Sequence, residues 1–175
     1  MLEKIKDTET EFPKFFGLIE KSFPSNERRP YDRQKLLFSD PAYSVYALYG
    51  ENRAIKACLA VWDFENFAFF EHFAVDPEYR NCGIGTKILA EAIDFLKKPV
   101  CLEAELPETE LAKRRLGFYK RNGFFVNDYD YVMPPLNVGE KPLPLLILTH
   151  GRKITENEFL NMQSTVYERV YGLQK

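Results

Sequence analysis

The first part of the chain carries apolar residues at a helical spacing. These apolar positions are Phe12, Phe15, Phe16, Ile19 and Phe23. Residues three and four apart lie on one face of a helix, so the spacing predicts an amphipathic helix that ends near Pro24. Thr8 or Thr10 is expected to cap its first turn. A second short helical run is predicted at residues 31–38.

Alternation of apolar and polar residues predicts strands in the rest of the chain. Leu102, Ala104 and Leu106, for example, alternate with Glu103 and Glu105. Strands are predicted at residues 43–49, 54–62, 67–75, 102–106, 124–133 and 143–148, with the first two joined as a hairpin at residues 50–52. Further helices are predicted at residues 84–97, from a cap at Thr109 to Gly123, and at about residues 155–171.

These elements follow the order α-α-β-β-β-α-β-α-β-β-α. An antiparallel meander followed by alternating strands and helices implies an α/β fold with a mixed, mostly antiparallel sheet and helices on both faces. Residues 134–144 are too rich in proline and glycine for regular structure, so we expect a long connection there. With 175 residues, 45% of them hydrophobic, the chain can bury one core, and we expect a single domain over residues 1–175.

The charge balance gives no general attraction to polyanions. The chain has 24 Lys and Arg against 26 Asp and Glu, a net charge of -2. We therefore expect no nucleic acid and no membrane as partner. A nucleic-acid-binding domain is an alternative only if its cations form one surface beside stacking aromatic residues. Those cations would be Arg28, Arg29, Lys113, Arg114, Arg115, Lys120 and Arg121.

Cysteine and histidine are too few and too far apart to predict a metal site. They are Cys58, Cys82, Cys101, His72 and His150, and the sequence has no Cys-x-x-Cys. An odd cysteine count and a first segment without an apolar stretch favour a reducing, cytoplasmic location. No apolar run approaches the length of a membrane span.

Two glycines lie where a predicted strand gives way to a predicted helix. Residues 80–86 read Arg-Asn-Cys-Gly-Ile-Gly-Thr. Without side chains at Gly83 and Gly85 the backbone can approach an anion closely, and the first amides of the helix point at it. The turn therefore predicts a ligand that carries a diphosphate. It is not a Walker A loop, and Ile88 stands where a dinucleotide fingerprint needs its third glycine.

Two segments resemble motifs of the GNAT acetyltransferases. FEHFAVDPEYRNCGIGTKIL is similar to the family's central motif, Arg/Gln-x-x-Gly-x-Gly/Ala after a strand that ends in Val. LAKRRLGFYKRNGF is similar to the next motif, a helix that carries Tyr119 and ends at Asn122-Gly123. Together the matches cover residues 43–131. The resemblance implies an N-acetyltransferase with acetyl-CoA as co-substrate, and the predicted order of elements agrees with it.

The resemblance assigns the parts of acetyl-CoA to two stretches. The turn would hold the diphosphate through Arg80, Asn81, Cys82, Gly83, Ile84, Gly85 and Thr86. The backbone of Phe73, Ala74 and Val75 would pair with the pantetheine amides as an added strand does. Cys82 is tempting as a nucleophile, but its neighbours include no histidine base, so we expect its amide to contribute instead.

Tyr119 is the leading catalytic candidate. Breaking the thioester expels a thiolate, and a protonated phenol can supply a hydrogen bond or a proton to that sulfur. Family resemblance supports this role, whereas helix spacing alone favours an aromatic residue that packs against the core.

Removal of a proton from the amine requires a base, because only the neutral amine attacks the carbonyl carbon. Glu71 and either Glu103 or Glu105 are candidates, and a water chain is the alternative. These glutamates could instead pair with cations such as those at residues 113–115. His72 could titrate near neutrality or serve as a hydrogen-bonded sheet residue. Many family members carry an asparagine near residues 103–109, and this chain has none there.

The acceptor in this family usually binds among the first helices, their loop and the last strands. The loop at residues 23–30 therefore becomes the expected acceptor wall, in which Glu27 could attract an amine and Arg28 a carboxylate, unless both are simply solvated. We expect the acceptor to be a primary amine of a small molecule or a peptide. An alternative of another class is a non-catalytic acyl-CoA sensor, and a homodimer is left open.

Overall fold

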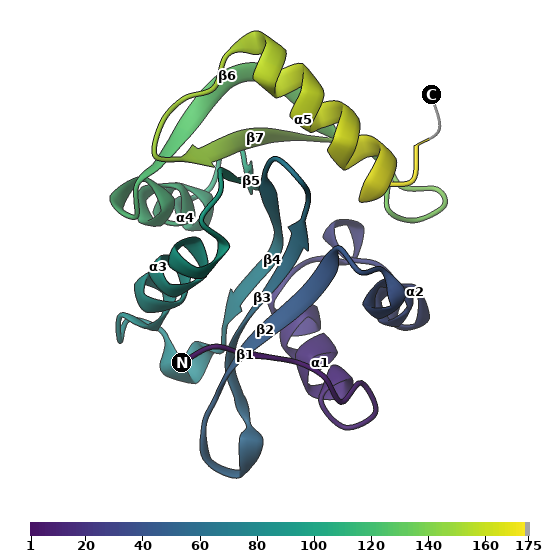
Figure 1. Cartoon of the computed structure of the whole chain (residues 1–175), viewed down its shortest axis with the longest axis vertical. Coiled ribbons are helices and arrows are strands. Elements are labelled where there is room, and N and C mark those ends of the chain that lie inside the picture. Colours follow the sequence, from purple (N-terminus) through teal and green to yellow (C-terminus); the bar gives the residue numbers. More distant parts are fainter. Residues whose placement is uncertain (174–175) are drawn as a thin grey trace. The chain divides into compact units, whose positions relative to one another are not determined.

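The structure, a computed structural model, describes residues 1–173 (Figure 1). The chain divides into two compact units. The first comprises residues 1–64 and 70–97, and the second begins with residues 65–69 and continues from residue 98. The order of the seven strands in the sheet is β1-β2-β3-β4-β5-β7-β6.

The first unit is built on an antiparallel meander. Strands β2 and β3 pair in a register that places Tyr43 opposite Trp62 and Ala47 opposite Cys58. The strands are β1 (Glu3–Lys4), β2 (Tyr43–Tyr49), β3 (Ile55–Asp63) and most of β4 (Ala68–Val75). The helices are α1 (Phe12–Ser22), α2 (Tyr31–Leu36) and α3 (Ile84–Leu96). Short 3-10 turns lie at Ser25–Glu27, Leu37–Ser39, Glu51–Arg53 and Pro77–Tyr79.

The apolar stripe of α1 is buried, as its spacing predicts. Phe12 and Phe15 have no exposed surface, and the Phe12 ring meets the edges of Tyr31 and Phe38 at centroid distances of 4.9 and 5.5 Å. The predicted cap is wrong. The N-cap residue is Glu11, and the Thr10 hydroxyl instead donates to the Asp7 carboxylate at 2.6 Å. Asp7 therefore organises the turn before the helix and occupies the hydroxyl that was expected to cap it.

The second unit combines three strands with two helices. Strands β5 and β6 each pair antiparallel with β7, and the β6–β7 register shifts between Asn127 and Tyr131. The Tyr119 ring of α4 packs on Phe124, and Phe159 of α5 stacks on Tyr129 at 4.5 Å. The elements are β5 (Val100–Glu105), α4 (Glu110–Arg121), β6 (Phe124–Met133), β7 (Leu143–His150) and α5 (Glu156–Arg169).

The predicted fold class is confirmed. The sheet is mostly antiparallel, and in the first unit α1 and α3 lie on opposite sides of the strands (Figure 1). The predicted order of elements is found with one addition, β1. Strand β1 has two residues, too few to show a period. Residues 134–142 contain no helix or strand, as their composition predicts. None of the helices that the structure describes is long and apolar enough to cross a membrane.

The helix ends of the second unit follow their local sequence. Thr109 caps α4 by accepting from the Ala112 amide at 3.1 Å, as predicted. Thr155 and Glu158 form a reciprocal capping box on α5. Helix α4 ends before Gly123, whose φ of 79° is a left-handed conformation that favours glycine.

Removal of the Thr109 cap should lower the free energy of unfolding. We expect Thr109→Ala to cost about 1 kcal/mol, because the Ala112 amide loses its acceptor, and Thr109→Ser to cost much less. Thr165→Ala, within α5, is the matched control, since that side chain caps no helix end. Urea denaturation measures the three changes, and equal losses in Thr109→Ala and Thr165→Ala would contradict the capping role.

Candidate active site

The glycine turn of the first unit is a tightly bonded connection from β4 to α3. Asp76 accepts from the Glu78 amide at 3.0 Å and so caps the short helix Pro77–Tyr79. Arg80 Nε donates to the Val75 carbonyl at 2.9 Å, which ties the turn to the end of the strand. Cys82 is exposed, and its thiol lies 3.5 Å from the Arg80 carbonyl. The turn is thus held by its own residues.

The start of α3 has the properties that an anion requires. Gly83 is the N-cap residue with a φ of 74°, and it has no side chain that could accept from the first helical amides. A Cβ atom added to Gly83 would meet nothing within 4 Å, so open space lies over the turn. Both α4 and α5 carry a threonine cap and glutamates in their first turns, whereas the first turn of α3 carries no carboxylate. These residues fit a diphosphate.

The strand residues assigned to pantetheine lie at the end of β4. Phe73 and Val75 are partly exposed and Ala74 is buried. The Val75 carbonyl accepts from Arg80, so one backbone acceptor of this stretch already has a partner. The pairing of these residues with pantetheine stays a prediction.

Tyr119 lies in the second unit on α4. Its ring contacts Phe118 and Phe124 at centroid distances of 5.5 and 5.7 Å, and the residue is partly exposed. Burial of the phenol raises the pKa of Tyr119 to about 12, with Arg115 opposing and Glu105 adding to the rise. Tyr119 therefore keeps its proton at neutral pH and can act as a donor.

Glu103 and Glu105 of the second unit have different partners. Glu105 accepts from Arg115 at 2.7 Å, so the expected pairing with residues 113–115 is found for this glutamate. Glu103 accepts from the hydroxyls of Tyr131 and Tyr171, the second at 2.6 Å. Burial, and then the charge of Glu103, raises the pKa of Tyr131 far above its usual value. Both oxygens of Glu103 thus accept hydrogen bonds.

Glu71 belongs to a buried polar cluster in the first unit. Its Oε1 pairs with Nη1 of Arg29, and its Oε2 accepts from the Trp62 indole at 3.1 Å. The side chains of Arg29 and Glu71 are 3% and 6% exposed. Burial would raise the pKa of Glu71, but the Arg29 charge and the hydrogen bonds from Arg29 and Trp62 lower it overall. Glu71 is therefore held as a carboxylate.

His72 lies beside Glu71 on the same strand. Its Nε2 is 3.1 Å from the Glu27 carbonyl, an acceptor, so Nε2 carries the proton and donates. Its Nδ1 is buried without a hydrogen-bond partner among the described residues, and it lies 3.8 Å from Glu71 Oε2. Burial lowers the pKa of His72, against the opposing effects of Glu71 and the Glu27 carbonyl. The imidazole is therefore neutral at neutral pH.

Arg29 was not predicted as a site residue. Its charge placed it among the cations of a nucleic-acid surface, but its side chain is buried against Glu71, so it cannot contribute to such a surface. Arg28 pairs with Glu20 at 3.3 Å and lies over the Phe16 ring. Glu71 lies 42 residues from Arg29 in the sequence, so no local signal could have identified the pair.

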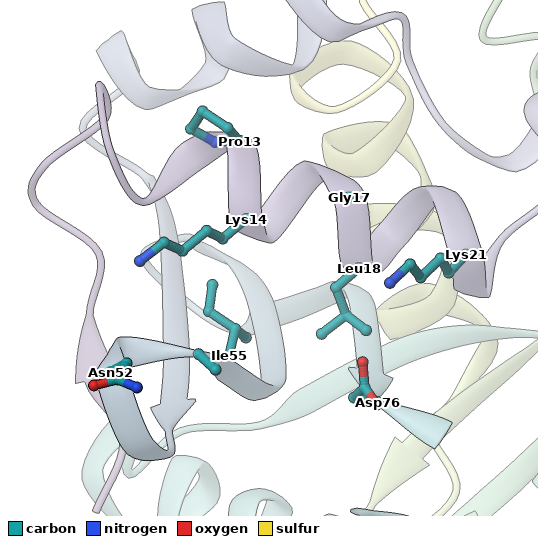
Figure 2. A pocket seen from close by; sticks show the side chains of 9 residues that line it. Pro13, Lys14, Gly17, Leu18, Lys21, Asn52, Ile55 and Asp76 are labelled. Carbon is teal, nitrogen blue, oxygen red and sulfur yellow. The ribbon is translucent and has the colours of Figure 1, made fainter. Parts of the chain in front are cut away.

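A cavity of the first unit lies elsewhere, and Figure 2 shows it beside α1. Its volume is about 430 Å³, and Leu18 and Ile55 lie between Lys14 and Lys21 along it. None of the residues predicted to bind acetyl-CoA or the acceptor lines it.

Among residues 1–173, no group of three or more His, Cys, Asp or Glu side chains could hold a metal ion.

The predicted site residues fall into the two units. The first contains the turn, residues 73–75, Glu71, Glu27 and Arg28, and the second contains Tyr119 and Glu103. In the first unit, the structure connects the Glu27 backbone to the strand that carries Glu71. The roles of all these residues stay predictions.

Comparison of the chain with known protein families finds one match. The family model described as Acetyltransferase (GNAT) family matches residues 7–124. A GNAT-family protein from Bacteroides thetaiotaomicron has a solved structure that is 31% identical, covers 99% of either chain and gives a TM-score of 0.90. The comparison with curated proteins found no match.

Two further solved structures share the fold at low identity. The ribosomal-protein-S18-alanine N-acetyltransferase of Escherichia coli is 17% identical, over 90% of this chain and 97% of that one, with a TM-score of 0.63. A chimera of the spermidine N-acetyltransferase SpeG from Vibrio cholerae and hSSAT is 13% identical, over 92% and 99%, with a TM-score of 0.62.

A bulky side chain at Gly83 should weaken the binding of acetyl-CoA. We expect Gly83→Trp to fill the open space over the turn and to weaken binding by roughly 100-fold or more in calorimetric titration. Gly139→Trp is the matched control, because Gly139 also has a positive φ and nothing within 4 Å of an added Cβ. If Gly83→Trp bound acetyl-CoA as tightly as Gly139→Trp, the turn would not be the diphosphate site.

The neutral, buried His72 should make the fold less stable in mild acid. Its pKa is lower in the folded chain than the value of about 6.5 in the unfolded chain, so the unfolded chain binds the proton more tightly. Stability due to His72 is complete above about pH 6.5 and is lost as the pH falls below that value. Thermal melting between about pH 7.5 and 5.5 should therefore drop further in the wild type than in His72→Gln. An equal drop in both proteins would refute a depressed pKa.

Proposed function

Because the chain belongs to the acetyltransferase (GNAT) family, we propose that it transfers an acetyl group from acetyl-CoA to a primary amine of a small molecule or peptide. One observation carries the proposal: the start of α3, with left-handed Gly83 as its N-cap and open space above it, is suited to a diphosphate. The named acceptors of two proteins with this fold, an alanine of a ribosomal protein and spermidine, support a primary amine.

Arg80, Asn81, Cys82, Gly83, Ile84, Gly85 and Thr86 would hold the diphosphate of acetyl-CoA. Backbone amides supply most of this site, so the side chains at Cys82 and Ile84 are free to vary. Phe73, Ala74 and Val75 would present their backbone to the pantetheine amides. In this proposal the thioester lies beyond the end of the pantetheine arm, away from the turn.

The chemical step is direct transfer within a ternary complex. The amine nitrogen bonds to the acetyl carbon, and the carbon–sulfur bond breaks. The nitrogen loses one proton and the sulfur gains one, which yields an acetamide and free CoA. Tyr119 would supply the proton or a hydrogen bond to sulfur, and its pKa of about 12 keeps it protonated at neutral pH.

The proton on the amine needs an acceptor. Glu103 is one candidate, although both of its oxygens accept hydrogen bonds from phenols, which makes it a weaker base. Glu71 is the other, and its pairing with Arg29 weakens it in the same way. A chain of water molecules is therefore an equal alternative to either carboxylate. Glu27 and Arg28 would contact the acceptor from the loop at residues 23–30.

Loss of the Tyr119 hydroxyl should slow turnover without weakening binding of acetyl-CoA. We expect Tyr119→Phe to lower kcat by about 100-fold, the low end for a lost general acid. Thiol release from acetyl-CoA with a reactive amine measures the rate, and calorimetry measures binding. Tyr129→Phe is the control, since its hydroxyl bonds only to the Ile154 carbonyl among the contacts described. An unchanged kcat in Tyr119→Phe would remove Tyr119 from the reaction.

A further inference from the structure

The loop between α1 and α2 is attached to strand β4 at two points. Residues 23–30 form this loop, which contains the short helix Ser25–Glu27 (Figure 1). One attachment is the side chain of Arg29, and the other is the backbone carbonyl of Glu27. The two attachments are made to consecutive residues of β4, Glu71 and His72. All four residues lie in the first unit.

The first attachment is an ion pair that is closed to solvent. The Arg29 side chain meets Glu71, and both side chains are more than nine-tenths buried. The Trp62 indole occupies the second oxygen of Glu71 at 3.1 Å. A buried charge without its partner is strongly unfavourable, so Arg29 cannot leave this position while Glu71 stays ionised and buried. The pair therefore restrains the loop more firmly than a surface pair would.

The second attachment uses the backbone, so it fixes the path of the loop itself. His72 donates from Nε2 to the Glu27 carbonyl at 3.1 Å, and the Phe23 ring packs edge-on against His72 at 4.9 Å. Successive side chains of a regular strand point to opposite faces. Glu71 and His72 nevertheless both contact this loop, one through the long side chain of Arg29 and the other through the carbonyl of Glu27. Two neighbouring residues of β4 thus contact the same loop.

We propose that Arg29, Glu71 and His72 are positioning residues that hold the loop at residues 23–30 in the conformation that binds the acceptor. In this arrangement Glu71 anchors the loop and does not remove the proton from the amine. The inference rests on the proposed function, since the loop is the proposed acceptor wall. The anchor itself can be tested without turnover.

Trypsin gives a test of the anchor that needs no substrate. Arg28 precedes Arg29, and Pro30 protects the bond after Arg29, so release of the loop exposes cleavage after Arg28. We expect cleavage at Arg28 to be about ten-fold faster in Arg29→Met than in the wild type. Arg53→Met is the matched control, because it breaks another pair between an arginine and a buried carboxylate, Glu11, outside this loop. Equal cleavage in wild type and Arg29→Met would overturn the anchor.

A double variant distinguishes release of the loop from misfolding of the whole protein. Arg29→Met with Glu71→Leu replaces both charges by apolar side chains, which usually preserves stability. We expect this double variant to melt close to the wild type and still to be cleaved faster after Arg28. Trp62 is the only tryptophan, so its fluorescence should change in the Glu71 variants and stay unchanged in Arg53→Met. A stable double variant cleaved at the wild-type rate would overturn the proposal.

Kinetics separate an anchor from a base, with spermidine and an alanine-initiated peptide as probe amines. If Glu71 anchors the loop, Arg29→Met and Glu71→Gln should each raise the acceptor KM about ten-fold. Both variants should change kcat little and leave the affinity for acetyl-CoA unchanged. Arg29→Lys should partly restore the KM. A fall of about 100-fold in kcat for Glu71→Gln alone would overturn the proposal and identify Glu71 as the base. Absence of turnover with both amines would count against the proposed function, and the trypsin result would still decide the anchor.

Discussion

The left-handed turn at Gly83 is the constraint on which the proposed chemistry depends. Helix α3 begins at a residue that has no side chain, so its first amides are not occupied by a cap of the kind that Thr109 gives α4. An unoccupied helix start is unfavourable unless water or a ligand bonds to it. The same backbone conformation that leaves the amides open also keeps a side chain from covering them. The backbone conformation that leaves the start of α3 uncapped is thus the one that an anionic co-substrate would need.

A second constraint is the buried charge of Glu71. Two segments of the first unit that are far apart in sequence meet at this carboxylate, and the Glu71 side chain is 6% exposed. Such a pair contributes little net stability, because the cost of removing both charges from water offsets their attraction. Its effect is on specificity of structure, since it allows one position of the loop at residues 23–30.

Sequence patterns predicted local structure well and the buried polar contacts poorly. Strands β2 and β6 were predicted to the residue because turn-forming residues bound them: Gly50 follows β2, and β6 lies between Gly123 and Pro134. The Thr109 cap followed because capping acts within three residues. The cap of α1 was wrong because Asp7, not the helix, took the Thr10 hydroxyl. The burial of Arg29 could not be predicted, because its partner lies 42 residues away and charge alone indicates a surface. The glycine turn was identified from its letters and from family resemblance together.

The most direct test of the proposed function is the dependence of thiol release on an added amine. Wild-type protein is incubated with acetyl-CoA alone and with a panel of primary amines, and the products are identified by mass spectrometry. We predict that CoA is released only when an amine is present, and that the acetyl group appears on its nitrogen. Tight binding of acetyl-CoA without amine-dependent release for any member of the panel would contradict the transferase and favour a sensor of acyl-CoA.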